Sequence, residues 1–304
     1  FRSNKLNLQT VYDMTSGATL KLSGGLVDTS TLAFQTVDAN FLRYADFLQG
    51  YVFGGYESPD FILRANWNIT KLPLENSSQP ALASVVNPNE SSVDNDANTY
   101  NIEAQHQIAL PVKNRFSYGV NYRLNTFSSD NIRGFSREHR LGLYLQNEWN
   151  ASSSLTAVAG VRVDLDTFIN PTYSPRGSLL WNPLEDHTFR ASVSVGYRPP
   201  TLFETNAKAG ATIAFPPPLG STTRSTEGNK NLDSERIISY ELAYQGWYVM
   251  HRLRLRTELF YNQLSDLIEI RPSGPGTTDP SRPSNGGKGK IYGGEASVEF
   301  LIYP

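Results

Sequence analysis

The side chains that most often bind metals or carry catalysis are sparse in this chain of 304 residues. It has four histidines and no cysteine, which excludes a thiolate metal site, a cysteine nucleophile and a disulfide framework. The histidines are scattered along the chain, whereas a metal site needs ligands that converge at a set geometry. We therefore predict no metal site and no cofactor. The four are His106, His139, His187 and His251.

One segment, Glu185-Asp186-His187, has the residue types of a catalytic relay. It lies where a tight turn is expected, and no clustered Ser/His/acid set accompanies it, so we predict that the protein is not an enzyme. The glycine-rich segment Asn285–Lys290 lacks the spacing of a phosphate loop and has no following helix. We expect a flexible loop tip there. The net charge of −2 argues against a generic nucleic-acid binder.

The residues best suited to binding lie in one long segment, Pro199–Leu232. It combines aromatic side chains with cations, a mixture suited to a planar or anionic ligand. Arg198 precedes it, either as a solvated cation where a strand ends or as a direct ligand contact. The candidate ligand-binding residues are Arg198, Phe203, Glu204, Lys208, Phe215 and Arg224.

Most of the remaining sequence alternates between apolar and polar residues with a period of two. In Tyr100–Leu110 one side is almost entirely apolar and the other almost entirely polar. The pattern recurs in Phe116–Leu124, Leu155–Asp164 and Phe189–Arg198, and no helical period of comparable strength competes with it. The apolar content of 39% and charged content of 18% are both low for a soluble domain. The predicted fold class is all-β.

The lengths of these segments and of their connections favour a membrane-spanning sheet. The segments run about 9–16 residues, longer than a typical sandwich strand and long enough to cross a bilayer. Every second connection is short, as in an outer-membrane barrel with tight turns at one end and long loops at the other. We predict an antiparallel transmembrane β-meander of about 13 strands, with a soluble β-fold as the alternative. The expected long connections are Asp28–Asp46, Leu72–Asn98, Thr126–Glu138, Thr167–Ser174, Pro199–Leu232 and Arg271–Lys288.

The alternation also predicts which side chains share a face of the wall. We expect lipid-facing Leu143, Val161, Val193 and Leu255, and lumen-facing Arg162, Arg190 and Arg254. The lumen-facing charges are nearly balanced in sign, which suits docking of a polar plug, although any wet barrel interior carries mixed charge. Trp149, Trp181 and Trp247 each lie beside a short turn and suggest an aromatic girdle.

The strand count indicates an incomplete barrel. Bacterial single-chain barrels have even strand counts, and an unpaired edge inside a bilayer is costly. The chain begins at Phe1 with no visible signal peptide, and the last strand, expected at Lys290–Tyr303, has an unpaired outer edge. We therefore expect a fragment of a larger barrel.

The stretch Tyr144–Glu204 resembles the barrel of TonB-dependent outer-membrane receptors. It carries the blocks YLQNEW, AGVRVD, SPRGSLLWNP and RASVSVGYRPP, the last followed by Glu204. Gly228–Glu235 is similar to the family's return from a large external loop, although Lys230 and Ser234 stand where the family often has proline. Phe260–Ile270 and Lys290–Glu299 continue the resemblance in the expected order.

The resemblance implies that residues 1–304 are part of a 22-stranded barrel domain, without its plug domain and C-terminal strands. It implies a transporter in the bacterial outer membrane, in contact with outer-membrane lipid. Such a transporter imports a scarce ligand, such as a ferric siderophore or cobalamin, and is energised by the TonB complex through the plug. A passive porin, which would need no plug, remains the alternative function.

Overall fold

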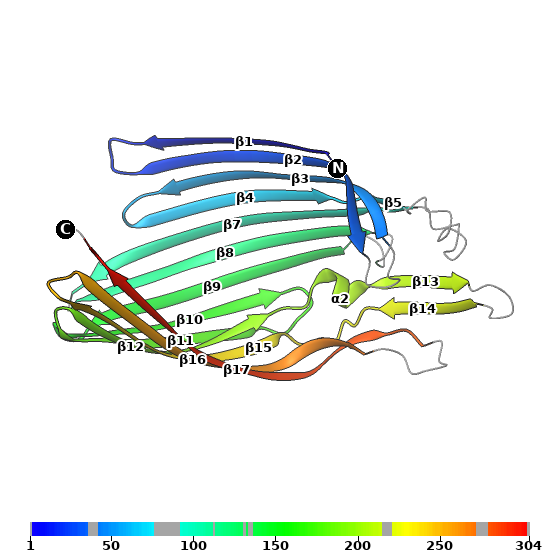
Figure 1. Cartoon of the computed structure of the whole chain (residues 1–304). Helices are drawn as coiled ribbons and strands as arrows, with labels where there is room; N and C mark the ends of the chain where they lie inside the picture. Colours follow the sequence, from blue (N-terminus) through cyan, green and yellow to red (C-terminus); the bar gives the residue numbers. More distant parts are fainter. Residues whose placement is uncertain are drawn as a thin grey trace.

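The computed structural model describes residues 2–35, 42–75, 92–111, 113–129, 132, 136–214, 221–271 and 279–302. In these ranges thirteen long strands follow one another in chain order in one antiparallel sheet, which curves into a trough (Figure 1). The predicted all-β antiparallel meander is therefore confirmed. The strands are β1 (Arg2–Asp13), β2 (Thr19–Gln35), β3 (Leu42–Glu57), β4 (Phe61–Lys71), β7 (Asn95–Leu110), β8 (Asn114–Ser129), β9 (Ser136–Asn150), β10 (Leu155–Asp166), β11 (Thr172–Leu184), β12 (His187–Arg198), β15 (Glu235–Tyr248), β16 (Leu253–Arg271) and β17 (Arg282–Phe300).

The smaller elements belong to the long connections. The short strands β5 (Leu74–Glu75) and β6 (Ser92–Val93) pair beside β3. Between β12 and β15 the chain forms the helix α2 (Leu202–Asn206) and a separate hairpin of β13 (Lys208–Ala214) and β14 (Ser221–Glu227). No helix among the described residues is long and apolar enough to cross a membrane.

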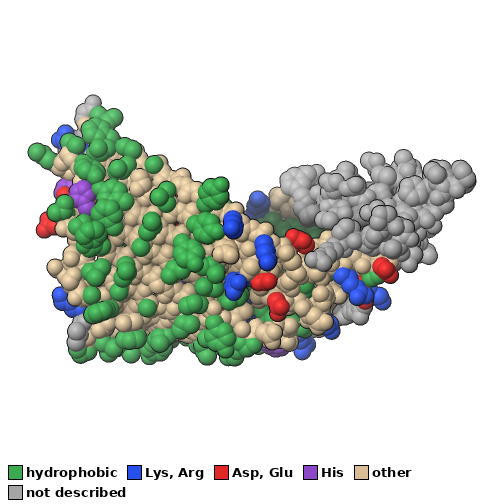
Figure 2. All heavy atoms as spheres, turned by 90° about the horizontal axis from the view of Figure 1, so that it is seen from below, with side chains coloured by type: hydrophobic (Ala, Val, Ile, Leu, Met, Phe, Trp, Pro, Cys, Tyr) green, Lys and Arg blue, Asp and Glu red, His purple; other side chains and the backbone are tan. Residues whose placement is uncertain are grey.

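The strand register divides the side chains between the two faces as predicted. Val193 lies opposite Tyr240, and Leu255 lies opposite Val298, on a face that carries large apolar side chains. On the other face Arg162 pairs with Asp164, and Arg190 lies 3.4 Å from Glu241. Figure 2 shows hydrophobic side chains spread over the underside of the trough. The trough therefore has an apolar outer face and a polar inner face.

The apolar face is not covered by a second layer. Leu242, Leu259 and Val298 are 60%, 62% and 66% exposed. Apart from prolines, the buried aliphatic residues of the described ranges are Ala18, Ile132, Ala207 and Leu232. A soluble sandwich would bury one face of each sheet against the other, so the absence of a covering layer over the described sheet argues against that alternative.

Several predicted loops are strand in the structure. The ladder of β2 and β3 continues past a bulge after Thr29 to the pair Gln35 and Leu42. Most of Asp28–Asp46 is therefore strand, and the prediction of a long loop there is wrong. Four other expected connections lose residues to the long strands beside them, from three in Thr167–Ser174 to eight in Arg271–Lys288. The connection that starts at Pro199 instead extends two residues beyond Leu232, and the last strand ends at Phe300 rather than Tyr303.

Asn285–Lys290 is likewise not a loop tip but part of β17. Gly287 lies opposite Leu267 at a bulge of the β16–β17 ladder. A Cβ at Gly287 would lie 2.5 Å from Glu269 Oε1 and 2.7 Å from Leu267 Cβ. Glycine at position 287 therefore permits β17 to pair with β16. A loop was expected here because a run of glycines lacks the alternation of apolar and polar residues from which strands are recognised.

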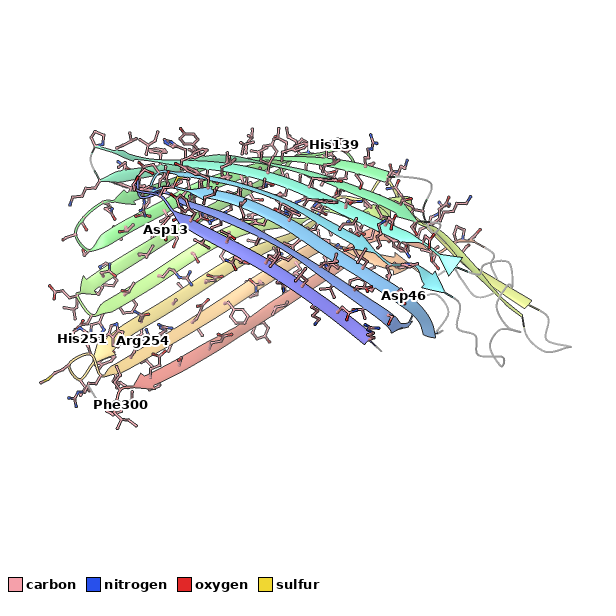
Figure 3. The ribbon with its side chains drawn as sticks, turned by 90° about the horizontal axis from the view of Figure 1, so that it is seen from above. Asp13, Asp46, His139, His251, Arg254 and Phe300 are labelled. Atoms are coloured by element: carbon pink, nitrogen blue, oxygen red, sulfur yellow. The ribbon has the colours of Figure 1, made fainter. Side chains whose placement is uncertain are left out.

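The aromatic girdle contains two of the three predicted tryptophans. Trp149 and Trp181 lie on the apolar face, whereas Trp247 lies on the polar face, with its ring centroid 5.0 Å from the guanidinium carbon of Arg254. The prediction is wrong for Trp247 because the even-numbered residues of β15 lie on the apolar face, so that Trp247, at an odd-numbered position, lies on the polar face. Other aromatic side chains lie at this end of the apolar face. The ring centroid of Phe189 lies 5.6 Å from that of Trp181 and 4.8 Å from that of Tyr244. Figure 3 shows Arg254, His251 and Phe300 at this short-turn end and Asp46 at the opposite end.

The assignment of faces predicts the cost of an outward charge. In the full-length protein folded into lipid vesicles, Val193→Arg should lower the free energy of unfolding by about 2–4 kcal/mol if position 193 lies near the bilayer midplane. Denaturant titration of refolded protein measures this loss.

The matched control is Ser239→Arg, which places the same charge on the polar face, where Ser239 lies opposite Ser194 and Asn262. Its cost should be small. A larger loss for Ser239→Arg than for Val193→Arg would contradict the assignment of faces.

Candidate ligand-binding rim

The connection between β12 and β15 starts with a capped helical turn. Pro199 and Pro200 end β12, since proline cannot donate to the ladder. The backbone N–H of Glu204 then donates to Thr201 Oγ1 at 3.1 Å, and the N–H of Thr201 donates to Glu204 Oε2 at 2.6 Å. This reciprocal capping satisfies two amide groups that a helix start leaves unpaired. The sequence Thr-x-x-Glu therefore sets where α2 begins.

Arg198 joins this turn to the wall. Its Nε and Nη2 donate to the two carboxylate oxygens of Glu235 at 2.5 and 2.7 Å, and Nη2 also donates to Glu204 Oε1 at 3.2 Å. Glu235 Oε1 also accepts the backbone N–H of Ile268 at 2.8 Å. The planar guanidinium is suited to such a two-oxygen contact. Arg198 thus ties the end of β12 to α2, β15 and β16, and we call this set of contacts the Arg198 clamp.

The residues after α2 pack tightly at the base of the connection. Thr205 and Ala207 are 3% and 1% exposed, and Ala207 bridges to Ile132 in the connection between β8 and β9. Gly228 returns so close that its Cβ would lie 2.5 Å from the backbone nitrogen of Ala207. Its N–H donates to Ala207 O at 2.8 Å. The loop therefore closes on itself before it continues to the wall.

The far side of the connection is tied to the start of β17. Arg282 Nη2 lies 2.5 Å from Glu227 Oε2, and the N–H of Glu227 donates to Ser281 O at 2.9 Å. Asn229 Nδ2 donates to Pro283 O at 3.0 Å. The base of the β13–β14 hairpin is therefore held at two places, at the connection between β8 and β9 and at the start of β17.

The structure brings together some of the predicted ligand-binding residues. Arg198 and Glu204 are in contact, and Phe203 lies beside them on α2. Lys208 opens β13 opposite Glu227, further from the wall, and Arg224 lies opposite Ala211 in the backbone ladder of the hairpin. Phe215 lies outside the described residues. The described members form an anchored platform rather than one converging pocket.

A polar cavity of about 300 Å³ opens on the inner face below this platform. At its edge Arg140 lies 2.6 Å from Glu138 and 2.7 Å from Asp166, and Arg123 donates only a weak bond, 3.4 Å, to Asn101 Oδ1. The alternation of residues predicts arginines that face the lumen, but it does not predict the cavity, because residues from five strands and two connections converge there. Its lining residues are Asn121, Arg123, Arg140, Arg162, Asp164, Asp166, Ile169, Thr172, Ser174, Tyr197, Pro199 and Ser234.

The charges around this cavity are arranged for hydrogen bonding rather than for metal binding. Arg162 contacts both oxygens of Asp164 at 2.6–2.9 Å, so the carboxylate is already neutralised. Within the described ranges no group of three or more His, Asp or Glu side chains could hold a metal ion. The arrangement suits contact with a large polar surface or ligand.

Solved structures with a similar fold are receptors from several bacteria. The siderophore receptor PirA from Pseudomonas aeruginosa matches with a TM-score of 0.64 and 15% identity, covering 99% of this chain and 60% of that one. The PirA receptor from Acinetobacter baumannii gives 0.73 and 13% identity, with 99% and 50% covered. The hemophore receptor HasR of Serratia marcescens, solved with its hemophore HasA and heme, gives 0.73 and 14% identity, with 97% and 51% covered.

The chain therefore spans about half to three fifths of the length of these receptors. No curated protein sequence matches it. A family profile described as "TonB dependent receptor-like, beta-barrel" matches residues 2–302. That match covers nearly the whole chain and agrees with the resemblance of Tyr144–Glu204 and with the curved antiparallel sheet. The chain belongs to the TonB-dependent receptor β-barrel family.

Proposed function

We propose that the full-length protein is a transporter of the bacterial outer membrane that binds a ferric siderophore at its long-loop end and imports it, energised by the TonB complex. The observation that carries the proposal is the anchored platform of α2 and the β13–β14 hairpin above the polar inner face. Family membership supports it, and the similar structures are named for siderophores and for a hemophore with heme. Cobalamin is the alternative ligand.

In this proposal residues 1–304 supply part of a 22-stranded barrel, and the full-length protein supplies the plug domain and the other strands. The inner wall suits a plug that must be released. Arg162 is paired with Asp164, Arg190 lies 3.4 Å from Glu241, and Arg254 is paired with Glu299. Because each of these charges already has a partner within the wall, a plug can form hydrogen bonds with them when it docks. Release of the plug then leaves no charge without a partner.

Uptake in living cells tests the proposal. The full-length gene is expressed in a strain that lacks its own siderophore receptors, with and without TonB, and uptake of labelled ferric siderophores and of cobalamin is measured. We expect uptake of at least one ferric siderophore, lost without TonB and on collapse of the proton-motive force. Uptake that is equal in both strains would indicate a passive porin instead.

The hairpin should carry much of the ligand affinity. Replacing residues 209–226 by a short Gly/Ser linker in the full-length protein should lower affinity about tenfold or more, ~1.4 kcal/mol, because the removed segment contains the candidate ligand-binding residues Phe215 and Arg224. Ligand titration at equal surface expression measures the change.

This deletion spares residues 205–207 and Gly228, which the structure packs against the connection between β8 and β9. Insertion into the membrane should therefore be unaffected. Unchanged affinity in the deletion variant would mean that the hairpin only shields the lumen.

The Arg198 clamp should affect ligand binding through the position of the loop. Arg198→Gln and Glu235→Gln should each weaken binding roughly fivefold, about 1 kcal/mol for a half-exposed ion pair. The double variant should be no weaker than either single one, because both substitutions break the same contact.

A double-mutant cycle of dissociation constants measures this coupling. If Arg198 instead contacts the ligand directly, Arg198→Gln will abolish binding while Glu235→Gln leaves it unchanged. That result would contradict an anchoring role for the clamp.

A further inference from the structure

Three arginines line the polar cavity below the platform, and carboxylates of the wall balance the charge of two of them. Arg140 lies 2.6 Å from Glu138 and 2.7 Å from Asp166. Arg162 donates to both carboxylate oxygens of Asp164. A negatively charged ligand in the cavity would have to compete with these carboxylates for either guanidinium.

The third arginine, Arg123, has no carboxylate partner in the described part of the chain. The only hydrogen bond of its side chain there is the 3.4 Å contact of Nε with Asn101 Oδ1. The strand register places Arg123 directly opposite Arg140. Like charges at opposite positions of a ladder repel each other, so an anion beside Arg123 would stabilise this part of the wall. Its guanidinium is therefore available to bind an anion.

Hydroxyl groups line the cavity beside the arginines. In the ladder of β10 and β11, Ser174 lies opposite Arg162. Thr172 lies opposite Asp164, so both hydroxyl side chains are on the polar inner face. Neither hydroxyl has a hydrogen-bond partner among the described residues. Because a hydroxyl can donate as well as accept, these two suit a ligand whose surface is rich in oxygen atoms.

The Arg198 clamp positions the upper wall of this cavity. Pro199, which follows Arg198 in the chain, lines the cavity, and so does Ser234, the residue before Glu235. The cavity holds about 300 Å³, at the lower end of the range of roughly 300–1,000 Å³ for small-molecule sites. In the described lining only Tyr197 has an aromatic ring. The site is therefore small, polar and poor in aromatic surface.

The iron of an imported complex would keep the ligands of its chelator at this site. Within the described ranges no group of three or more His, Asp or Glu side chains could hold a metal ion. The wall can therefore recognise only atoms on the outside of the complex. A carboxylate there suits Arg123, because a guanidinium binds the two oxygens of a carboxylate through two parallel hydrogen bonds.

We propose that the imported ferric complex belongs to the hydroxycarboxylate class and that Arg123 binds one of its carboxylates in this cavity. The inference rests on the proposed function, since it names the class of ferric siderophore that the receptor binds. In such a complex carboxylate and hydroxyl oxygens surround the iron, and carboxylates that do not bind the iron project from the surface. A projecting carboxylate matches the unpaired guanidinium, and the oxygens around it match the hydroxyls of Thr172 and Ser174.

A complex of the tricatecholate class fits this cavity less well. Its surface consists largely of aromatic rings, which gain most from contact with other aromatic side chains, and the described lining offers them Tyr197 alone. It also carries several negative charges and no projecting carboxylate. Among the described lining residues Arg123 is the single cation without a carboxylate partner, so most of these charges would find no unpaired cation.

Titration of the purified full-length protein with ferric complexes tests the inference. The probes are ferric citrate, a ferric tricatecholate and a ferric trihydroxamate, and the variants are Arg123→Gln and Arg123→Lys. We expect ferric citrate to bind to the unaltered protein about tenfold more tightly than the other complexes. Arg123→Gln should weaken this binding about tenfold, through the loss of a charge-assisted contact. Arg123→Lys should weaken it less, because lysine keeps the charge without the two parallel hydrogen bonds.

The matched control is Arg176→Gln. Arg176 lies on the same face of β11, two residues beyond Ser174, and its side chain donates to Gln146 rather than to a carboxylate. It does not line the cavity, so its substitution should leave the binding of ferric citrate unchanged. The heat-dependent gel shift of folded barrels checks that every variant folds.

Three outcomes would overturn the inference. Tighter binding of the tricatecholate or the trihydroxamate than of ferric citrate would refute the ligand class, while the proposed import of a ferric siderophore would stand. An equal loss of affinity in Arg123→Gln and Arg176→Gln would mean that ferric citrate responds to the charge of the lumen and not to this cavity. Binding of none of the complexes would contradict the proposed function itself, and the inference with it.

Discussion

Every strand of this wall must satisfy two different surroundings at once, while its backbone hydrogen bonds go only to neighbouring strands. Because the sheet has no covering layer in the described residues, stability cannot come from a buried core between two layers. It depends on the ladder and on what each face meets. An apolar face without a covering layer is stable against lipid, and a polar face is stable against water or another polar surface. The alternation of residues follows from that constraint.

The polar face meets this demand by pairing its charges locally. Arg162 pairs with Asp164, and Arg140 pairs with Glu138, each within a single strand. The wall therefore presents many donors and acceptors but little net charge. At the rim the same chemistry serves a different purpose, because Arg198 pairs with carboxylates from two other segments and so determines where a loop leaves the wall.

The sequence was sufficient to predict the strands, their faces and the alternation of short and long connections, because a period of two is visible in single residues. It was misleading where the pattern is interrupted. Asn285–Lys290 reads as a flexible loop, yet Gly287 is what lets β17 pair with β16. The cavity below the platform could not be predicted, since it depends on how far apart five strands and two loops lie. The clamp joins residues more than thirty positions apart, and only Thr201 and Glu204 left a local signature, the capping box.

The closure of the loop base at Ala207 and Gly228 separates two parts of the chain that are under different structural constraints. Residues up to Ala207 and from Gly228 onward are held by contacts with the wall, so changes there disturb the barrel. The hairpin between them is joined to this base at Lys208 and Glu227, and near Glu227 its second strand also contacts Ser281 beside β17. Its sequence and length can drift, or be exchanged with those of a relative, while the scaffold stays the same. The surface at the long-loop end can therefore change through a single insert, while the strand register of the wall is kept.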